Sequence, residues 1–182
     1  MTGRPLYLIG FMASGKSTLG RALAARLQGC RFIDLDDAVG AAEGMSVSDI
    51  FRSRGADYFR QAENNTLRRI SQPGCIIACG GGTPCHDGNM DFMLAQGDVV
   101  WLQADNDVTM HRLRLAAGQR PLVDALLDKP DELEKYIAGL LEERTPYYSR
   151  ANFVFDSNRL EDEEQIDGSC RLFIAKLKLP TN

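Results

Sequence analysis

The stretch Leu6-Tyr-Leu-Ile-Gly-Phe-Met-Ala-Ser-Gly-Lys-Ser17 decides the fold class of this chain. Its apolar run, Leu6–Ile9, predicts a buried strand. The residues from Gly10 to Ser17 match the pattern G-x-x-x-x-G-K-[ST]. The segment 16–28 then places Leu19, Leu23 and Leu27 on one stripe of a helix that Gly29 ends. A strand, a glycine-rich turn and an amphipathic helix in this order predict a phosphate-binding loop.

The residue types of this loop suit a bound phosphate. Gly10 and Gly15 let the backbone turn its N–H groups toward an anion, and the start of the following helix adds partial positive charge. In such a loop the lysine, Lys16, reaches the β- and γ-phosphates, and the serine, Ser17, ligates Mg²⁺. The sequence therefore predicts nucleotide binding. The expected nucleotide contacts in the loop are Gly10, Ala13, Ser14, Gly15, Lys16, Ser17 and Thr18.

Further apolar runs of the strand type follow, and helical patterns separate them. The predicted strands are 31–34, 75–79, 99–102 and 153–155, and the predicted helices are a short one from Ser46 to near Gly55, then 57–70, 90–95, 106–115, 131–143 and 161–178. This alternation indicates an α/β fold of three layers, α/β/α, with a mostly parallel five-stranded sheet between helices. Since no repeat or linker divides the sequence, we expect a single domain over 1–182.

Composition narrows the class of protein. The 182 residues are 44% hydrophobic, which is enough for one core. With 21 Lys+Arg against 25 Asp+Glu the net charge is -4, so no basic field attracts nucleic acid. The first apolar stretch is too short to span a membrane. The five cysteines are an odd number and contain no C-x-x-C pair, so we expect neither a zinc site nor a disulfide framework. We expect a cytoplasmic protein that binds neither nucleic acid nor membranes.

Two carboxylates follow the second predicted strand. If the chain stays extended through Asp34-Leu-Asp36, both side chains point to the same side. Ligands of open α/β sheets lie at the carboxyl ends of the strands, so both carboxylates would face the site. One can support Mg²⁺, and the other can orient or deprotonate an attacking hydroxyl. The alternative is that Asp37 caps the next helix and the other two are solvated.

Further patterns have ordinary structural interpretations when each is taken alone. They are Phe59-Arg60-Gln-Ala-Glu63, Gly80-Gly81-Gly82 after the third strand, Arg120-Pro121-Leu122, and Arg144-Thr-Pro-Tyr-Tyr148. Arg60 and Glu63, for example, form a surface ion pair in the simplest interpretation. The segment 116–130 has a weak helical pattern and predicts a mobile excursion without a core element. An arginine in such a segment, here Arg120, can close over transferring phosphates.

Together, the phosphate loop, the paired aspartates and these patterns resemble the shikimate kinase family, in the same order, from Leu6 to about residue 159. The resemblance implies a P-loop kinase fold with a substrate-binding helical region at about 35–62 and a lid at about 116–130. It implies transfer of the γ-phosphoryl group of ATP to the 3-hydroxyl of shikimate, a step toward chorismate and the aromatic amino acids. It also implies a monomer whose substrates are ATP and shikimate and whose cofactor is Mg²⁺.

The resemblance assigns roles to individual residues. The implied catalytic residues are Lys16, Asp36 and Arg120, with Asp36 as the base. The implied substrate-binding residues are Asp36, Arg60, Gly81, Gly82 and Arg144, where the two arginines clamp a carboxylate, a task that suits the planar guanidinium. Ser17 and Asp34 would hold Mg²⁺, Arg120 and Arg159 would contact ATP, and Glu63 would help to hold Arg60.

The chain departs from the family pattern at two positions. Ala13 replaces a glycine of the loop, which an alanine tolerates where its φ is negative. Cys79 stands where the family often has a hydroxyl residue, which removes a water-mediated contact to Mg²⁺. The neighbouring residues His111, Arg112 and Arg114 are interpreted as a solvated helix face.

Two alternatives remain open at this point. Gluconate kinases and nucleoside monophosphate kinases share the phosphate loop and the architecture but use other acceptors; the triple glycine and the two arginines favour a cyclic hydroxy acid. A non-catalytic ATP-binding module, in which nucleotide switches a partner surface, belongs to a different class. Such a module needs neither the base Asp36 nor the lid residue Arg120.

Overall fold

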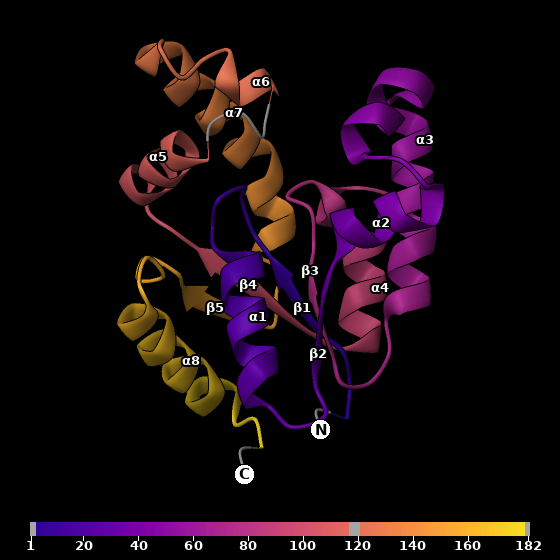
Figure 1. Cartoon of the computed structure of the whole chain (residues 1–182), viewed down its shortest axis with the longest axis vertical. Coiled ribbons are helices and arrows are strands. Elements are labelled where there is room, and N and C mark those ends of the chain that lie inside the picture. Colours follow the sequence, from indigo (N-terminus) through magenta and orange to yellow (C-terminus); the bar gives the residue numbers. More distant parts are fainter. Residues whose placement is uncertain (1–2, 117–120, 181–182) are drawn as a thin grey trace.

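The computed structural model describes residues 3–116 and 121–180 (Figure 1). Within these residues, the strands form one five-stranded sheet in the order β2-β3-β1-β4-β5, and each adjacent pair is parallel. The strands are β1 (Leu6–Ile9), β2 (Arg31–Asp34), β3 (Cys75–Ala78), β4 (Asp98–Gln103) and β5 (Phe153–Asp156). Tyr7 of the central strand pairs with Ile77 on one side and Val99 on the other. The predicted parallel sheet is confirmed.

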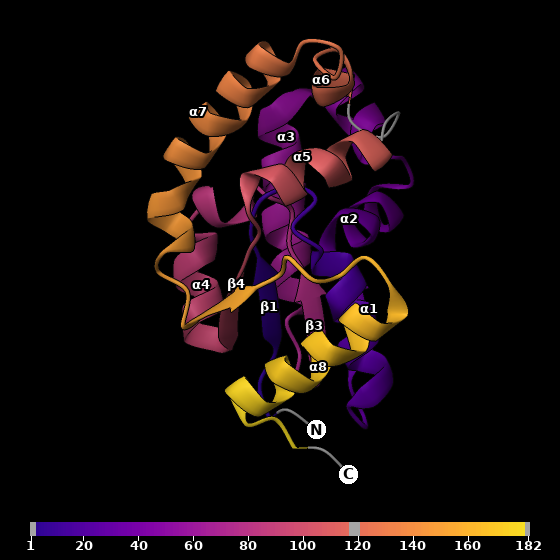
Figure 2. The same cartoon turned by 90° about the vertical axis from the view of Figure 1, so that its left-hand side faces the viewer.

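Helices cover both faces of the sheet (Figures 1 and 2). On one face, α1 (Lys16–Arg26) and α8 (Glu163–Leu177) bury Leu19, Leu23 and Phe173 against Leu8 and Ile76. The opposite face is covered by α3 (Val47–Ile70), α4 (Asn89–Gln96) and the end of α7 (Pro130–Tyr148). Because helices cover both faces of the sheet, the inner strands β1 and β3 are continuous apolar runs that are buried throughout. The three-layer α/β/α arrangement is confirmed.

The segment after β2 differs from the expectation. The chain does not stay extended through Asp36, because α2 (Leu35–Glu43) begins directly after the strand. Asp34 is the N-cap of this helix, and its Oδ1 accepts a hydrogen bond from the backbone N–H of Asp36 at 3.1 Å. A carboxylate at this position satisfies a backbone donor that the helix leaves free. Asp34 therefore takes the capping role that the sequence suggests for Asp37.

The predicted division of the next helical region at Gly55 is confirmed. Ser46 caps α3, since its Oγ accepts from the backbone N–H of Asp49 at 3.1 Å. Gly55 interrupts the helix with φ 83 and ψ 175, a backbone conformation that favours glycine. Helix α7, in contrast, extends to Tyr148, well past the predicted end at residue 143. It continues through Pro146 because Tyr148 is buried in the core and anchors the last turn.

A separate apolar cluster lies beyond the carboxyl edge of the sheet, where α5 (Asn106–Leu115), α6 (Pro121–Asp124) and α7 meet (Figure 2). Its buried members are Phe11, Leu113, Val123, Leu133 and Ile137. The expectation that 116–130 contains no core element is wrong here, because residues 121–124 are helical and Val123 is 3% exposed. Phe11 and α7 supply the apolar surface, which the pattern of the segment itself does not indicate. Residues 117–120, with Arg120, lie outside the described residues.

Within residues 3–116 and 121–180, no helix combines the length and the apolar character needed to cross a membrane.

Candidate active site

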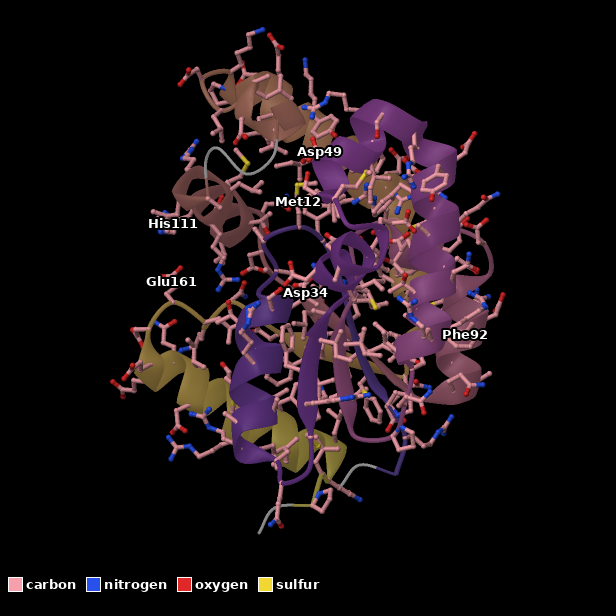
Figure 3. The ribbon with its side chains drawn as sticks, turned by 45° about the vertical axis from the view of Figure 1, so that its right-hand side comes forward. Met12, Asp34, Asp49, Phe92, His111 and Glu161 are labelled. Carbon is pink, nitrogen blue, oxygen red and sulfur yellow. The ribbon has the colours of Figure 1, made fainter. Side chains whose placement is uncertain are left out.

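A cavity of about 1080 Å³ opens at the carboxyl edge of the sheet. Its walls include the loop after β1, the aspartates after β2 and the first glycines after β3, together with Met45 and Val47 from the α2–α3 side and Leu115 from the end of α5. In Figure 3, Met12 and Asp34 lie near the centre of the molecule between these two sides. Because all strands are parallel, their carboxyl ends bring these separate segments together.

Backbone geometry makes the glycine pattern of the phosphate loop necessary. Gly10 has φ 140, and a Cβ there would lie 2.5 Å from the carbonyl oxygen of Leu102. Gly15 has φ 86 and is the N-cap of α1. Lys16 donates from Nζ to the carbonyl oxygens of Gly10 at 3.0 Å and Phe11 at 2.7 Å. The loop thus surrounds an ammonium group at a helix N-terminus, an arrangement that binds phosphate.

Ala13 departs from the expectation about its backbone. The sequence interpretation requires a negative φ for an alanine at this position, but the φ of Ala13 is 59. An L-residue in the left-handed region costs about 1–2 kcal/mol. Contacts on either side hold the loop in this conformation, since the backbone N–H of Ser14 donates to the carbonyl oxygen of Phe11 at 3.3 Å and Lys16 holds the same oxygen. The loop therefore stores strain at Ala13.

Ser17 and Asp34 are in direct contact at the cavity wall. Ser17 donates its Oγ proton to Oδ2 of Asp34 at 2.7 Å. The serine oxygen therefore keeps its lone pairs for a cation, and the carboxylate beside it supplies negative charge. Mg²⁺ takes oxygen ligands, typically one or two from the protein and the others from water and substrate phosphates. The residues present thus fit Mg²⁺.

Asp36, in the first turn of α2, lines the cavity. Solvent reaches its carboxylate through the cavity, yet the protein surrounds it on most other sides. This desolvation raises the pKa of Asp36 to about 6, and the negative charges of Asp34 and Glu63 act in the same direction. Lys16 and Arg60 oppose the shift. An aspartate with this pKa accepts a proton more readily than an ordinary one, yet it is mostly ionised at neutral pH.

The three consecutive glycines after β3 make room for polar and charged side chains, which at Gly80 include Thr83 and Glu63 as well as Asp36. A Cβ at Gly80 would lie 3.2 Å from Oδ1 of Asp36, and a Cβ at Gly81 would lie 3.0 Å from Nη1 of Arg144. At Gly82 the added atom would lie 2.8 Å from Nη2 of Arg60. The triple glycine therefore brings side chains from α2, α7 and α3 against one short backbone segment.

Arg60 is not part of a surface ion pair. Its Nη1 donates to Oε2 of Glu63 at 2.7 Å, and Glu63 is 0% exposed. The other carboxylate oxygen of Glu63 accepts from Oγ1 of Thr83 at 2.6 Å. A buried carboxylate requires such partners, and its charge fixes the guanidinium that pairs with it. The structural interpretation of this pair as solvated is therefore wrong.

Arg144 approaches the glycines from α7. Its guanidinium carbon lies 5.9 Å from the centre of the Phe11 ring. In the next turn of α7, Tyr148 donates from its hydroxyl to the carbonyl oxygen of Gly81 at 2.5 Å and so ties the helix to the glycine turn. Arg60 and Arg144, distant in sequence, therefore converge on Gly81 and Gly82. Of these four predicted residues Gly81 lines the cavity, and the other three lie behind that lining.

The cavity is also lined by an arginine that the sequence interpretation leaves out of the site. Arg112 of α5 lines the cavity with Leu160 and Glu161 and donates to the carbonyl oxygens of Ser157 at 3.0 Å and Asn158 at 2.9 Å. Burial lowers the pKa of Arg112. The interpretation of Arg112 as part of a solvated face is wrong. In the sequence, the only indication that Arg112 is partly buried is its apolar neighbour Leu113, which is itself buried.

Arg159, expected to contact ATP, is exposed and does not line this cavity. Its carbonyl oxygen accepts from Oγ of Ser169 on α8 at 2.7 Å, which directs this part of the loop toward the helix. Glu161, two residues further on, reaches the cavity instead and lies below α5 in Figure 3. Arg120 lies outside the described residues.

Cys79, directly before the glycines, is a core residue. Its thiol is buried, and the sulfur lies 3.7 Å from the sulfur of Met93. Burial raises the pKa of this thiol, so it stays protonated and unreactive.

The similarity of this site to known proteins is extensive. A family model described as shikimate kinase matches residues 12–173. A shikimate kinase from Bacteroides thetaiotaomicron is 38% identical over 175 residues, which cover 96% of this chain and 98% of that protein. The chain belongs to the shikimate kinase family. Another relative, the shikimate kinase of Synechococcus sp. (strain CC9605), is 36% identical over 182 residues, 100% of this chain and 88% of that protein.

Solved structures of shikimate kinases agree with the observed fold. The crystal structure of the enzyme from Bacteroides thetaiotaomicron superposes with a TM-score of 0.89, at 38% identity, over 96% of this chain and 98% of that one. The enzyme from Acinetobacter baumannii in complex with shikimate has a TM-score of 0.79 at 26% identity, over 97% and 94% of the two chains. A gluconokinase from Sinorhizobium meliloti, at 19% identity and a TM-score of 0.55 over 97% and 94%, shares the fold alone.

These matches confirm the resemblance drawn from the motifs. They confirm the expected activity of the chain, ATP-dependent phosphorylation of shikimate, over the gluconate kinase, nucleotide kinase and binding-module alternatives. ATP is accordingly the co-substrate of this shikimate kinase.

Proposed function

We propose that Asp36 accepts the proton of the 3-hydroxyl of shikimate while Arg60 and Arg144 hold its carboxylate. The observation that carries this proposal is the convergence of the three side chains on Gly80, Gly81 and Gly82, next to the phosphate loop. Two cations and one carboxylate along a short backbone segment are complementary to a hydroxy acid, whose acid group and hydroxyls lie at opposite ends of a ring.

The proposed reaction is a direct transfer. The acid is held at the arginine end, so a hydroxyl is directed toward Asp36 and the phosphate loop. As the hydroxyl oxygen forms its bond to the γ-phosphorus, its proton passes to the carboxylate of Asp36, and the bond from phosphorus to the leaving ADP oxygen breaks. Lys16 leaves the carbonyl oxygens of its loop to bind phosphate oxygens and stabilises the charge that develops on them.

We propose that Ser17 and Asp34 hold Mg²⁺, because the serine keeps free lone pairs beside a carboxylate. Mg²⁺, when bound, neutralises phosphate charge. Asp34 acts mainly through two hydrogen bonds that its carboxylate accepts. One comes from the hydroxyl of Ser17 and fixes its orientation, and the other comes from the backbone N–H of Asp36. In this arrangement Asp34 links the metal position to the base.

The proposed nucleotide contacts are the loop from Gly10 to Thr18 for the phosphates, and Arg112 and Leu160 beside the adenine ring. Arg112 supports this assignment because hydrogen bonds to two carbonyl oxygens hold its flat guanidinium at the cavity wall. Arg120 of the lid at 116–130 is proposed to close over the phosphates, since Leu115, directly before this segment, and Ala116, its first residue, line the cavity. Arg159 is proposed only as a peripheral contact.

The remaining proposals concern the whole chain. Residues 1–182 are proposed to form one domain, with 35–62 binding shikimate; Met45 and Val47 support this because they line the cavity. The protein is proposed to be a cytoplasmic monomer without nucleic-acid or membrane partners. In the described part of the chain, large apolar side chains are exposed on several separate elements, as Leu115, Tyr147 and Leu172 illustrate. Light scattering at several concentrations tests the monomer.

The acceptor and the base can be tested in one assay. ADP release is measured with shikimate, quinate, gluconate and AMP offered separately, for the wild type and for Asp36→Asn. We expect strong stimulation by shikimate, a fall in kcat of at least about 10²-fold in the variant, and little change in its affinity for ATP. Asp131→Asn, an exposed carboxylate in the first turn of α7 that does not line the cavity, is the matched control and should retain kcat within about twofold. Near-normal turnover of Asp36→Asn would make the base assignment wrong.

A further inference from the structure

A closed ring of hydrogen bonds joins α3 to the turn that follows the glycines. Thr83, the first residue of the short 3₁₀ helix Thr83–Cys85, donates from Oγ1 to Oε1 of Glu63 at 2.6 Å. Asn89, the first residue of α4, donates from Nδ2 to the carbonyl oxygen of Thr83 at 3.1 Å. Asn64 donates from Nδ2 to Oδ1 of Asn89 at 2.9 Å. Because Glu63 and Asn64 are consecutive on α3, the ring is closed.

Three members of the ring are completely buried. Glu63, Thr83 and Asn89 are each 0% exposed. Buried polar groups are stable only when they are paired, so a ring in which each group has a partner permits one geometry. Asn89 does not cap α4, and like Glu63 and Thr83 it does not line the cavity. A buried amide with donor and acceptor both engaged between two other elements acts as a spacer.

The ring bounds Arg60 on two sides. Its carboxylate, Glu63, accepts from Nη1 of Arg60 at 2.7 Å. The residue before Thr83 is Gly82, whose Cα is so close to Nη2 of Arg60 that an added Cβ would lie 2.8 Å from it. A displacement of the Thr83 turn would therefore move both the partner of the guanidinium and the backbone against which it lies.

We propose that Asn89 is a positioning residue for acid binding: it holds the Thr83 turn against α3 and thereby fixes the guanidinium of Arg60. Asn89 touches no substrate and acts through Thr83 and Glu63. The inference rests on the role proposed above for Arg60, and it adds a residue of α4 that lies behind the site. A guanidinium fixed before the acid binds loses less conformational entropy on binding, which raises affinity.

The outer arm of the network provides a control. Arg68 donates from Nη1 to the same Oδ1 of Asn89 at 3.2 Å, and its guanidinium carbon lies 4.7 Å from the centre of the Phe92 ring. Phe92 lies at the outer edge of the molecule in Figure 3, away from the cavity. Replacement of Arg68 keeps the bond from Asn64 to Asn89 and hence the ring.

The first experiment measures steady-state kinetics of the full chain with Mg²⁺, varying shikimate and ATP separately. For Asn89→Leu and for Thr83→Val we expect the KM for shikimate to rise about tenfold, with the KM for ATP and kcat within about threefold. Thr83→Ser keeps the hydroxyl and Arg68→Met keeps the ring, so both should stay within about twofold of the wild type. Thermal unfolding of each variant shows whether it is folded. If Asn89→Leu is unfolded, the comparison of Thr83→Val with Thr83→Ser tests the ring instead.

The second experiment is a double-mutant cycle with Arg60→Ala. If Asn89 acts through Arg60, Asn89→Leu raises the KM for shikimate less than about twofold in the Arg60→Ala background. The full tenfold rise in both backgrounds would overturn the inference, as would an unchanged KM in Asn89→Leu when Arg60→Ala raises it. An unchanged KM in Arg60→Ala itself would instead remove the proposed arginine clamp, and the inference with it.

Discussion

The two ends of the candidate site are built in different ways. The phosphate end is a single run of residues, Gly10 to Ser17, in which backbone groups and one lysine surround the ligand position. The acid end is assembled from α2, α3, α7 and the glycine turn. Arg60 pairs with Glu63 of its own helix, and contacts between elements, from Thr83 to Glu63 and from Tyr148 to Gly81, hold this arrangement together. Local geometry thus suffices for a phosphate, whereas a specific hydroxy acid requires side chains that only tertiary packing brings together.

The largest expected effect tests the phosphate end. Lys16→Ala should lower kcat by about 10³-fold and weaken ATP binding, because the ammonium group stabilises the charge that develops on the phosphate oxygens. ADP release gives kcat, and calorimetry with ATP gives the Kd. Lys135→Ala, an exposed position on α7, is the control. Normal turnover of Lys16→Ala would contradict the mechanism.

The acid end should respond differently. Arg144→Ala should raise the KM for shikimate by about 10- to 100-fold, because a charge-assisted hydrogen bond is lost, while the Kd for ATP stays the same. Initial rates at varied shikimate measure the first quantity and calorimetry the second. Arg150→Ala, which removes a surface ion pair with Asp91, should change neither. If Arg144→Ala weakened ATP binding equally, the two ends would not be separable.

Asp36 lies between the two ends, and its titration should appear in both activity and stability. Since its pKa is raised to about 6, kcat/KM should fall about tenfold per pH unit below pH 6, as the base becomes protonated. Asp36→Asn should lack this acidic limb.

Ionisation of Asp36 favours activity but lowers the stability of the folded protein. A carboxylate whose pKa is raised on folding destabilises the folded state above the folded pKa, and this cost disappears as the pH falls below the value of the unfolded chain, 3.8. Asp36→Asn should therefore raise the Tm at pH 8 but not at pH 3.5, measured by thermal unfolding. A lower Tm for the variant at pH 8 would contradict the raised pKa.

The smallest expected effect concerns the strain in the phosphate loop. Ala13→Gly should stabilise the protein by about 0.5 kcal/mol, since relief of the left-handed φ exceeds the added entropy of the unfolded chain. Ala24→Gly, in the interior of α1, should destabilise it by about 1 kcal/mol. Chemical denaturation measures both. Destabilisation by Ala13→Gly would mean that this residue is not strained.

Sequence patterns predicted the sheet, most helices and the break at Gly55, because apolar periodicity and glycine preferences are local properties. They failed for the start of α2, where Asp34 caps the helix, and for α6, whose burial depends on Phe11 and α7. The burial of Glu63 was likewise hidden, since a helical Arg-x-x-Glu spacing is common on surfaces.

The sequence by itself determined the fold class, the phosphate loop and, through its motifs in order, the family. Tertiary structure alone decided that Arg112 faces the cavity while Arg159 does not, that the three glycines lie against charged side chains of three helices, and that Asn89 supports Arg60 from behind. The physical reason is the range of the interactions. A turn and a helix start depend on neighbours in the chain, whereas the burial and pairing of a charge depend on residues that the fold brings from elsewhere.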